Sequence, residues 1–258
     1  MKLLKTEKLS INFGGLIAVN EVNFDISDGE IVGLIGPNGS GKTTFFNLIT
    51  GVYKPSKGKI LFHNEDITKL SIHQITIKGI ARTFQNSRLF LDLSVLDNIL
   101  IGMYCRQKTN LWEIVLHHSY SDKEIKEDIE KSFELLGYFS KEMLKGCCRK
   151  VKELPQADKR KLEICRALAS DPSLLLLDEP SAGMNPEETF ELMEDINKVK
   201  KKKKNISIII IEHDMSVIKG ITERVVVLNY GKKIAEGSFN DISKDSEVRR
   251  AYLGKGAV

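Results

Sequence analysis

The chain has 258 residues, of which 41% are hydrophobic and 29% are charged, and its formal net charge at pH 7 is +4. That length accommodates one large domain or two small ones. The net charge is too small to argue for nucleic-acid binding, so we predict no nucleic-acid partner. The longest apolar runs fall far short of the roughly 20 residues of a membrane helix, and the start of the chain lacks the apolar core of a secretory signal. We therefore expect a cytosolic globular protein.

The four cysteines have no CxxC spacing, which is typical of reduced thiols in a cytosolic chain. A metal site built from Cys147, Cys148 and the adjacent His117 and His118 is an alternative, but it matches no ligand spacing. The lysine run "KVKKKKKN" at 198–205 lies between an expected helix and an expected strand. We therefore interpret it as a solvated loop and not as a site for nucleic acid or lipid.

The first third of the chain predicts strands and one helix. The segment "VNFDI" at 22–26 alternates apolar and polar residues, as a half-buried strand does, and "IVGLIG" at 31–36 is an apolar run of strand length. The next segment, "KTTFFNLITG" at 42–51, has helical spacing and ends on a glycine stop signal. Two shorter strands are expected in "KILF" at 59–62 and in "GIARTFQ" at 79–85.

The rest of the chain predicts helices, and then further strands alternating with helices. From about 89 to 165 the pattern is helical, and its clearest amphipathic stretch is 123–139. Three apolar runs follow at 174–178, 206–211 and 224–228, separated by polar segments of helix length. This alternation indicates an α/β fold whose mainly parallel sheet is flanked by helices on both faces. An antiparallel β portion at the N-terminus and a helical subdomain complete the predicted fold.

The segment "GPNGSGKT" at 36–43 matches the pattern G-x-x-x-x-G-K-[ST] between a predicted strand and a predicted helix. Such a loop binds nucleotide phosphates because its glycines let backbone N–H groups turn inward, while Lys42 adds a positive charge and Thr43 a hydroxyl ligand for Mg²⁺. A glycine turn with an incidental lysine is the alternative. The predicted nucleotide-binding residues of this loop and the residue after it are Gly36, Pro37, Asn38, Gly39, Ser40, Gly41, Lys42, Thr43 and Thr44.

Acidic and polar residues follow the other predicted strands. Asp178 and Glu179 end the run "LLLLDE", where an open α/β sheet places its ligands. We predict that Asp178 holds Mg²⁺ through water and that Glu179 is the general base for the attacking water. A pair of helix-capping acids is the alternative. His213 ends the next strand, where we expect it to reach a γ-phosphate, although a structural histidine is the alternative. Gln85 ends an earlier strand, where we expect it to contact Mg²⁺ and the attacking water.

Together these motifs resemble the ATP-binding-cassette family over essentially the whole chain, as a P-loop NTPase core with ATP and Mg²⁺ as cofactors. The resemblance implies a single domain at 1–258, with a core at 1–88 and 166–258 and a helical subdomain at 89–165. It also implies that two such subunits sandwich two ATP molecules, each site pairing one P-loop with the signature turn of the other chain. Phe13 stands where the family stacks a ring on adenine, although simple hydrophobic packing is an alternative.

Further segments resemble the ATPase of branched-chain amino-acid importers, among them "FGGLIAVNEVNF", "GIARTFQNSRLF" and the terminal "RRAYLG". That resemblance implies an ATPase peripheral to the inner face of the cell membrane, which powers transport together with a second ATPase and two membrane permease subunits. The region Ser87–Leu96 is expected to receive a helix of a permease, and packing within the subdomain is its alternative. A nucleotide-binding regulatory module with weak hydrolysis and a lipid or polysaccharide exporter are the other candidate functions.

One segment departs from the family. Where the family's signature has serine, a small or aromatic residue, glycine and glutamine, Leu154 is followed here by Pro155, Gln156, Ala157 and Asp158. Proline offers neither a hydroxyl nor an N–H group to a phosphate. We infer that the Asp158 carboxylate fills the anion site of its own helix. The change impairs a homodimer but leaves this chain's own nucleotide residues intact, so we expect a heterodimer with a second ATPase.

Overall fold

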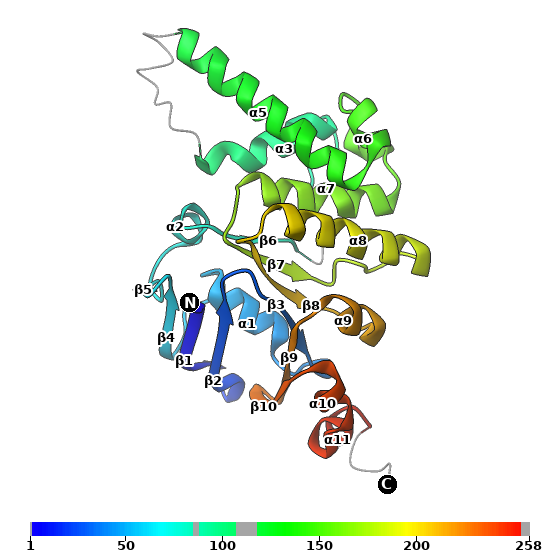
Figure 1. Cartoon of the computed structure of the whole chain (residues 1–258). Coiled ribbons are helices and arrows are strands. Elements are labelled where there is room, and N and C mark those ends of the chain that lie inside the picture. Colours follow the sequence, from blue (N-terminus) through cyan, green and yellow to red (C-terminus); the bar gives the residue numbers. More distant parts are fainter. Residues whose placement is uncertain (1, 85–87, 107–117, 254–258) are drawn as a thin grey trace. The chain divides into compact units, whose positions relative to one another are not determined.

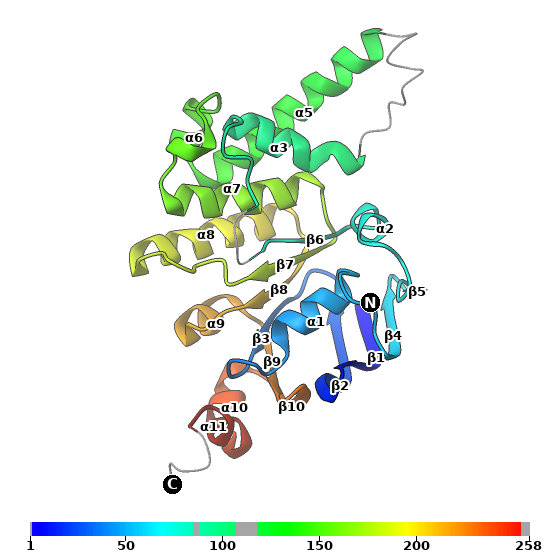
Figure 2. The ribbon, with the colours of Figure 1, turned by 180° about the vertical axis from the view of Figure 1, so that it is seen from behind.

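The computed structural model describes residues 2–84, 88–106 and 118–253 (Figures 1 and 2). The chain forms two compact units. The first consists of 1–82, 173–180 and 203–258, and the second of 83–172 and 181–202. The sequence-based division of the chain at 89 and 165 is a different partition and stays a prediction.

The first unit begins with an antiparallel sheet in the strand order β2-β1-β4-β5. Its strands are β1 (Lys2–Phe13), β2 (Leu16–Ser27), β4 (Lys57–Phe62) and β5 (Glu65–Asp66). Shifts of register interrupt the pairing of β1 with β2, and Lys8 and Glu21 have positive φ angles in these strands. These irregularities increase the local twist of the two long strands.

The same unit contains a six-stranded sheet in the order β10-β9-β3-β8-β7-β6, in which only the edge pair β10 and β9 is antiparallel. Its strands are β3 (Ile31–Ile35), β6 (Ile80–Arg82), β7 (Leu174–Asp178), β8 (Ser207–Ile211), β9 (Arg224–Asn229) and β10 (Lys232–Gly237). The helices of this unit are α1 (Lys42–Ile49), α2 (Ile72–Ile77), α9 (Met215–Ile221), α10 (Phe239–Lys244) and α11 (Ser246–Leu253).

Helix α1 joins the two sheets into one core. In both views it lies between the antiparallel sheet and the strands of the parallel sheet (Figures 1 and 2). Phe45 and Phe46 on α1 are completely buried, and the Phe45 ring packs edge-on against Phe24 of β2 at 5.3 Å between centroids. Strands β3, β7 and β8 are buried along their whole length. Burial on both faces is why their sequences are continuous apolar runs.

The second unit is helical. It contains α3 (Val95–Met103), α5 (His118–Phe139), α6 (Lys141–Lys145), α7 (Gln156–Ala169) and α8 (Pro186–Lys202), with short 3₁₀ turns η1 (Tyr104–Arg106) and η2 (Val151–Glu153). Helix α7 packs against both α3 and α5, and α8 packs against α5. Leu162, Cys165 and Leu168 form the buried face of α7. Burial raises the pKa of the Cys165 thiol far above its usual range.

The predicted fold class is confirmed, with a mainly parallel sheet flanked by helices, an antiparallel N-terminal portion and a helical part. One local interpretation is wrong: the lysine run at 198–205 is not all loop, because α8 continues to Lys202. Lysines in the last turn of a helix interact favourably with its negative end, which explains why the helix extends into the run. No helix among the described residues is long and apolar enough to cross a membrane.

Candidate functional site

Three neighbouring parallel strands place the candidate residues at one edge of the sheet. Strand β3 pairs with β8, and β8 pairs with β7, all in parallel. Gly36 follows the end of β3, Asp178 and Glu179 stand at the end of β7, and His213 follows β8. Because parallel strands end at the same edge, residues far apart in the chain meet there, as ligand sites in open α/β sheets require.

The phosphate loop is packed so closely that two of its positions require glycine. A Cβ on Gly36, whose φ is 150°, would lie 2.1 Å from the Leu228 carbonyl oxygen, and one on Gly41, whose φ is 103°, would lie 2.5 Å from that of Ala18. Those oxygens belong to the backbone, which cannot swing aside. The loop therefore holds a shape that only glycine permits at these positions.

The Lys42 ammonium group and the Ser40 hydroxyl fit a phosphate ligand. Lys42 is buried and donates hydrogen bonds from Nζ to the carbonyl oxygens of Gly36 at 2.8 Å and Pro37 at 3.1 Å. Burial lowers its pKa, while Glu179 and Asp178 oppose that shift. The buried Ser40 Oγ has no hydrogen-bond partner among the described residues. A cationic group and an unsatisfied hydroxyl inside one glycine loop match the chemistry of a bound phosphate chain.

Glu179 and His213 are in direct contact. The Nε2 atom of His213 lies 2.7 Å from Oε1 of Glu179, and the Glu179 backbone N–H donates to the Ile211 carbonyl at 2.9 Å. Glu179 has a φ of 50°, a left-handed conformation that is costly for a residue with a branched or long side chain. Strain of this kind concentrates at functional sites, where the surrounding structure enforces it.

A cleft of about 570 Å³ contains most of the predicted nucleotide residues. The sequence-predicted residues that line it are Phe13, Asn38, Gly39, Ser40, Gly41, Lys42, Thr43, Thr44, Glu179 and His213. Gly36, Pro37 and Asp178 do not line it, and Gln85 lies outside the described residues. The Phe13 side chain is 45% exposed, and its ring meets that of Tyr53 edge-on at 5.2 Å. A half-exposed ring at the mouth of the cleft favours base stacking over plain core packing.

Sequence reasoning missed other residues of this region. Tyr230, at the turn between β9 and β10, also lines the cleft, and it is 84% exposed with a φ of 45°. The next residue, Gly231, ties this turn to the phosphate loop, because its N–H donates to the Ser40 carbonyl at 2.9 Å. The only local signal for this turn was Gly231, which follows the apolar run at 224–228.

Asp178 forms an ion pair with Arg82, a residue that the motifs did not indicate. Nη2 of Arg82, the last residue of β6, donates to Oδ2 of Asp178 at 2.7 Å. The two side chains are only 4% and 3% exposed. The residue that we predicted as a magnesium ligand is thus already engaged in a buried ion pair.

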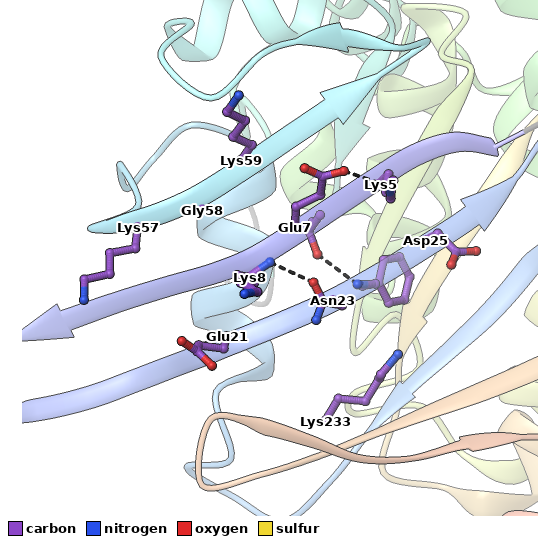
Figure 3. A pocket seen from close by; sticks show the side chains of 12 residues that line it. Lys5, Glu7, Lys8, Glu21, Asn23, Asp25, Lys57, Gly58, Lys59 and Lys233 are labelled. Atoms are coloured by element: carbon purple, nitrogen blue, oxygen red, sulfur yellow. Dashed lines mark hydrogen bonds and ion pairs between the residues drawn. The ribbon is translucent and has the colours of Figure 1, made fainter.

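A second hollow, of about 660 Å³, lies on the exposed side of the antiparallel sheet (Figure 3). Its charged lining residues are Lys5, Glu7, Lys8, Glu21, Asp25, Lys57, Lys59 and Lys233. Lys5 pairs with Glu7 at 2.7 Å, which raises the pKa of Lys5 and lowers that of Glu7. The lining of this hollow includes neither the phosphate loop nor Glu179 and His213, which line the other cleft.

The altered signature segment forms the start of α7. Pro155 is the N-cap residue, without a side-chain cap, and Asp158 stands in the first turn. The inference that Asp158 fills the anion site of its own helix is not supported, because within the described ranges its carboxylate makes no hydrogen bond. Burial raises its pKa, with Lys161 opposing the shift. A carboxylate satisfied by the helix N-terminus would have a lowered pKa instead.

The described part of the region Ser87–Leu96 exposes apolar side chains on a fixed backbone. Phe90 and Leu91 are 49% and 47% exposed. The buried Asn98 side chain accepts from the Phe90 N–H at 2.9 Å and donates to its carbonyl at 3.0 Å. Arg166 of α7 donates to the Arg88 carbonyl at 2.6 Å. Ser87 itself lies outside the described residues.

The glycine loop between β3 and α1, with an acidic pair at the end of the parallel strand β7 in the same sheet, defines a P-loop nucleoside triphosphatase. Comparisons with known proteins narrow this class. A family model described as "ABC transporter" matches residues 19–182, and one described as "Branched-chain amino acid ATP-binding cassette transporter" matches residues 232–258. The chain therefore belongs to the ATP-binding cassettes of ABC transporters, the ATPases that bind nucleotide for transport.

Individual relatives cover nearly the whole chain. The high-affinity branched-chain amino acid transport ATP-binding protein LivG of Escherichia coli strain K12 is 40% identical over 253 residues, 98% of each chain. The corresponding protein BraF of Pseudomonas aeruginosa is 36% identical over 98% of each chain. Among solved structures, a nucleotide-free ATP-binding cassette from an ABC transporter superimposes with a TM-score of 0.84 at 31% identity, covering 99% of this chain and 100% of the other. An ADP conformation of such a cassette gives a TM-score of 0.83.

Proposed function

We propose that this chain hydrolyses ATP to power a membrane importer of branched-chain amino acids, and that it works beside a second, different ATPase. The observation that carries the proposal is the cleft of the first unit, where the phosphate loop, Glu179 and His213 meet, together with a signature segment that lacks its phosphate-binding groups. The names of its relatives support the substrate class.

ATP binding rests on the cleft residues. The Lys42 ammonium group meets the β- and γ-phosphates, and the backbone N–H groups of the loop surround them. Hydrogen bonds from Lys42 Nζ to the carbonyls of Gly36 and Pro37 hold the ammonium group inside the loop. Phe13 supplies a ring face for adenine, which stacks on aromatic side chains with a gain of about 1–3 kcal/mol per base.

Thr43 and Asp178, with Gln85, are the residues that would hold Mg²⁺. A hydroxyl and carboxylate or amide oxygens suit this hard cation. When bound, Mg²⁺ neutralises the charge that develops on the phosphates. Lys42 contributes a positive charge to the cleft; burial lowers its pKa, and the nearby carboxylates of Glu179 and Asp178 oppose that shift.

Glu179 orients the attacking water and accepts its proton. The His213 imidazole, 2.7 Å away, fixes the position of the Glu179 carboxylate and faces the terminal phosphate. The left-handed backbone of Glu179 holds its side chain at the strand end, where it lines the cleft beside the phosphate loop. General base catalysis of this kind contributes about 10²- to 10⁴-fold to the rate.

A heterodimer follows from the chemistry of the signature segment. In the family, each ATP is completed by the signature turn of the opposite chain, so Pro155 and Asp158 would meet the ATP of the partner. A missing donor to a developing charge costs about 10²- to 10³-fold in rate. The site of this chain suffers no such loss when a partner with an intact signature completes it.

We infer that the permease subunits dock on the region Ser87–Leu96, in whose described part Phe90 and Leu91 are exposed on a backbone held by Asn98 and Arg166. Exposed apolar groups on an ordered backbone are typical of protein contacts. This placement makes the chain a cytoplasmic subunit held peripherally at the inner face of the membrane.

The test is purification of the tagged chain from its source membranes, followed by identification of the bound chains and measurement of ATPase rates. We expect a second cassette ATPase and two permeases to copurify, and the isolated chain to bind ATP but hydrolyse it slowly. Adding the partner ATPase should restore turnover. A homodimer with the full rate of the reconstituted complex would overturn the heterodimer.

A nucleotide-binding regulatory module is the second candidate, and the change at Pro155–Asp158 is the observation that favours it. Its prediction differs in one respect. In the complex with the partner, the rate would not depend on Glu179. The Glu179→Gln experiment described in the Discussion therefore separates the two functions.

A further inference from the structure

Among the described residues, Arg82 contacts Asp178, Asn47 and Phe46 around the acidic strand end. Its Nη2 donates to Oδ2 of Asp178 at 2.7 Å, and its Nη1 donates to Oδ1 of Asn47 at 2.6 Å. The guanidinium carbon lies 5.3 Å from the centre of the Phe46 ring. Asn47 and Phe46 belong to α1, the helix that begins at the phosphate loop. Arg82 thus connects the phosphate-loop helix with the carboxylate at the end of β7.

The geometry of these contacts fixes the direction of the Asp178 carboxylate. A guanidinium group is planar and presents its donors in a rigid fork, so an anchor on Asn47 determines where the other nitrogen points. The apolar face of Phe46 restrains the plane of the group further. Both charged side chains are nearly inaccessible to water, so the pair is not loosened by solvent. A carboxylate held in this way cannot rotate freely.

We propose that Arg82 is a positioning residue for the divalent cation, which acts by orienting the Asp178 carboxylate. This inference rests on the proposed role of Asp178 as a magnesium ligand. Partners that orient a metal ligand typically contribute 10- to 100-fold to metal affinity or activity. A lysine at position 82 keeps the positive charge but offers a compact ammonium group that cannot reproduce the fork between Asn47 and Asp178.

The competing interpretation is that the ion pair only stabilises the fold. Arg224 provides a matched control, because it is another arginine of the first unit with several acidic partners, among them Glu30 at 2.7 Å and Glu236. Arg224 lies on β9, and none of its contacts with described residues is with Asp178. Loss of either arginine should lower the melting temperature, but only loss of Arg82 should change the response to Mg²⁺.

The experiment compares the full-length wild type with Arg82→Lys, Asn47→Ala, Asp178→Asn and Arg224→Lys. Three quantities are measured: the melting temperature without nucleotide, the Kd of a fluorescent ATP analogue in EDTA, and the Mg²⁺ concentration that gives half of the Mg²⁺-dependent change in that binding. For Arg82→Lys we expect a Kd in EDTA within about twofold of wild type and a half-saturating Mg²⁺ concentration that rises about 10-fold. Asn47→Ala should raise it less, by about 3-fold, because one anchor of the guanidinium remains. Arg224→Lys should leave it unchanged.

Two results would overturn the proposal. In the first, Arg82→Lys and Asn47→Ala both have a half-saturating Mg²⁺ concentration within twofold of wild type or below it, while Asp178→Asn has a raised one. In that case the metal role of Asp178 stands and the orienting role of Arg82 fails. The other is an unchanged value for Asp178→Asn itself, which removes the proposed metal ligand and the inference with it. If Arg82→Lys does not fold, Asn47→Ala decides, because it leaves the buried ion pair in place.

Discussion

The phosphate loop and the start of α7 are both phosphate-binding elements in this family, yet the fold restricts substitutions at the loop more than at the start of α7. At the loop, a Cβ on Gly36 or Gly41 would collide with backbone oxygens, so a substitution there damages the fold as well as the site. At α7, Pro155 occupies an N-cap position, where a helix tolerates a residue without an N–H group. The signature can therefore lose its chemistry without loss of the helix.

The same contrast holds for the charges of the two regions. In the first unit, Glu179 contacts His213 and Asp178 contacts Arg82, so each acid has a specific partner. In the second unit, Asp158 is half-buried without a hydrogen bond among the described residues, and its pKa is raised. An acid that has partners is part of an organised site, whereas an acid that burial penalises is a cost to the fold. The predictions below test this difference.

The largest effect is expected at Glu179. With the partner ATPase present, Glu179→Gln should lower kcat by about 10²- to 10⁴-fold, because it removes the general base while keeping the shape of the side chain. The Kd for ATP should stay within about twofold of wild type. Steady-state ATPase assays and nucleotide titrations measure the two quantities.

Glu127→Gln on α5 is the matched control, since Glu127 is exposed and does not line the cleft, and it should behave as wild type. Equal rates for wild type and Glu179→Gln in the complex would contradict the catalytic assignment and support the regulatory module.

The next largest effect is expected at α7. The triple variant Pro155→Ser, Ala157→Gly and Asp158→Gln restores a hydroxyl, a close backbone approach and a neutral side chain at the start of the helix. The ATPase rate of the chain alone, at concentrations that allow dimerisation, should rise by about 10²- to 10³-fold. Adding Glu179→Gln to the triple variant should abolish the gain. A triple variant that is folded but no faster than wild type would sink the idea that this segment limits the homodimer.

The sequence predicted the elements that obey a simple pattern. The runs at 174–178 and 206–211 are buried on both faces and became β7 and β8. The glycine spacing at 36–43 predicted the phosphate loop because that chemistry depends on consecutive residues. Strand β1 was not predicted. The positive φ of Lys8 and the register shifts of the strand break the alternation on which strand prediction depends.

The partners of the site residues were not predictable in the same way. Arg82 and Asp178 are 96 positions apart, and only the parallel pairing of β6 with β7 makes them neighbours. The exposed Tyr230 carries no apolar pattern, so its place at the cleft depends on the fold of the hairpin. Contacts between distant strands require the three-dimensional structure, whereas local motifs do not.

A smaller effect is expected from Asp158→Asn, with a definite dependence on pH. Burial raises the pKa of this carboxyl in the folded state, so at pH 7 the folded chain bears the cost of a half-buried charge. Because the folded state binds the proton more tightly than the unfolded state, wild-type stability relative to the variant falls as pH rises through the folded pKa. Asp158→Asn should therefore be the more stable protein at pH 7.

The advantage of Asp158→Asn should shrink as pH falls and vanish below the ordinary range of an aspartate, where the carboxyl is protonated in both states. Urea titrations of wild type and variant at several pH values measure the difference. A variant less stable than wild type at pH 7 would mean that the carboxylate does have a stabilising partner, as the helix-filling interpretation requires.

The smallest effect is expected at the turn beside the phosphate loop. Tyr230 and Gly231 both have positive φ angles, 45° and 75°, as a tight hairpin turn of the Asn-Gly type requires. Tyr230→Asn should relieve the left-handed strain and raise the free energy of unfolding by about 1 kcal/mol, whereas Tyr230→Val should lower it, since β-branched residues fit this conformation worst. Thermal and chemical denaturation measure both changes. If Tyr230→Asn gains nothing while Tyr230→Val loses nothing, the turn carries no strain. If the expected order holds, Tyr230 reduces the stability of the hairpin turn that lines the cleft.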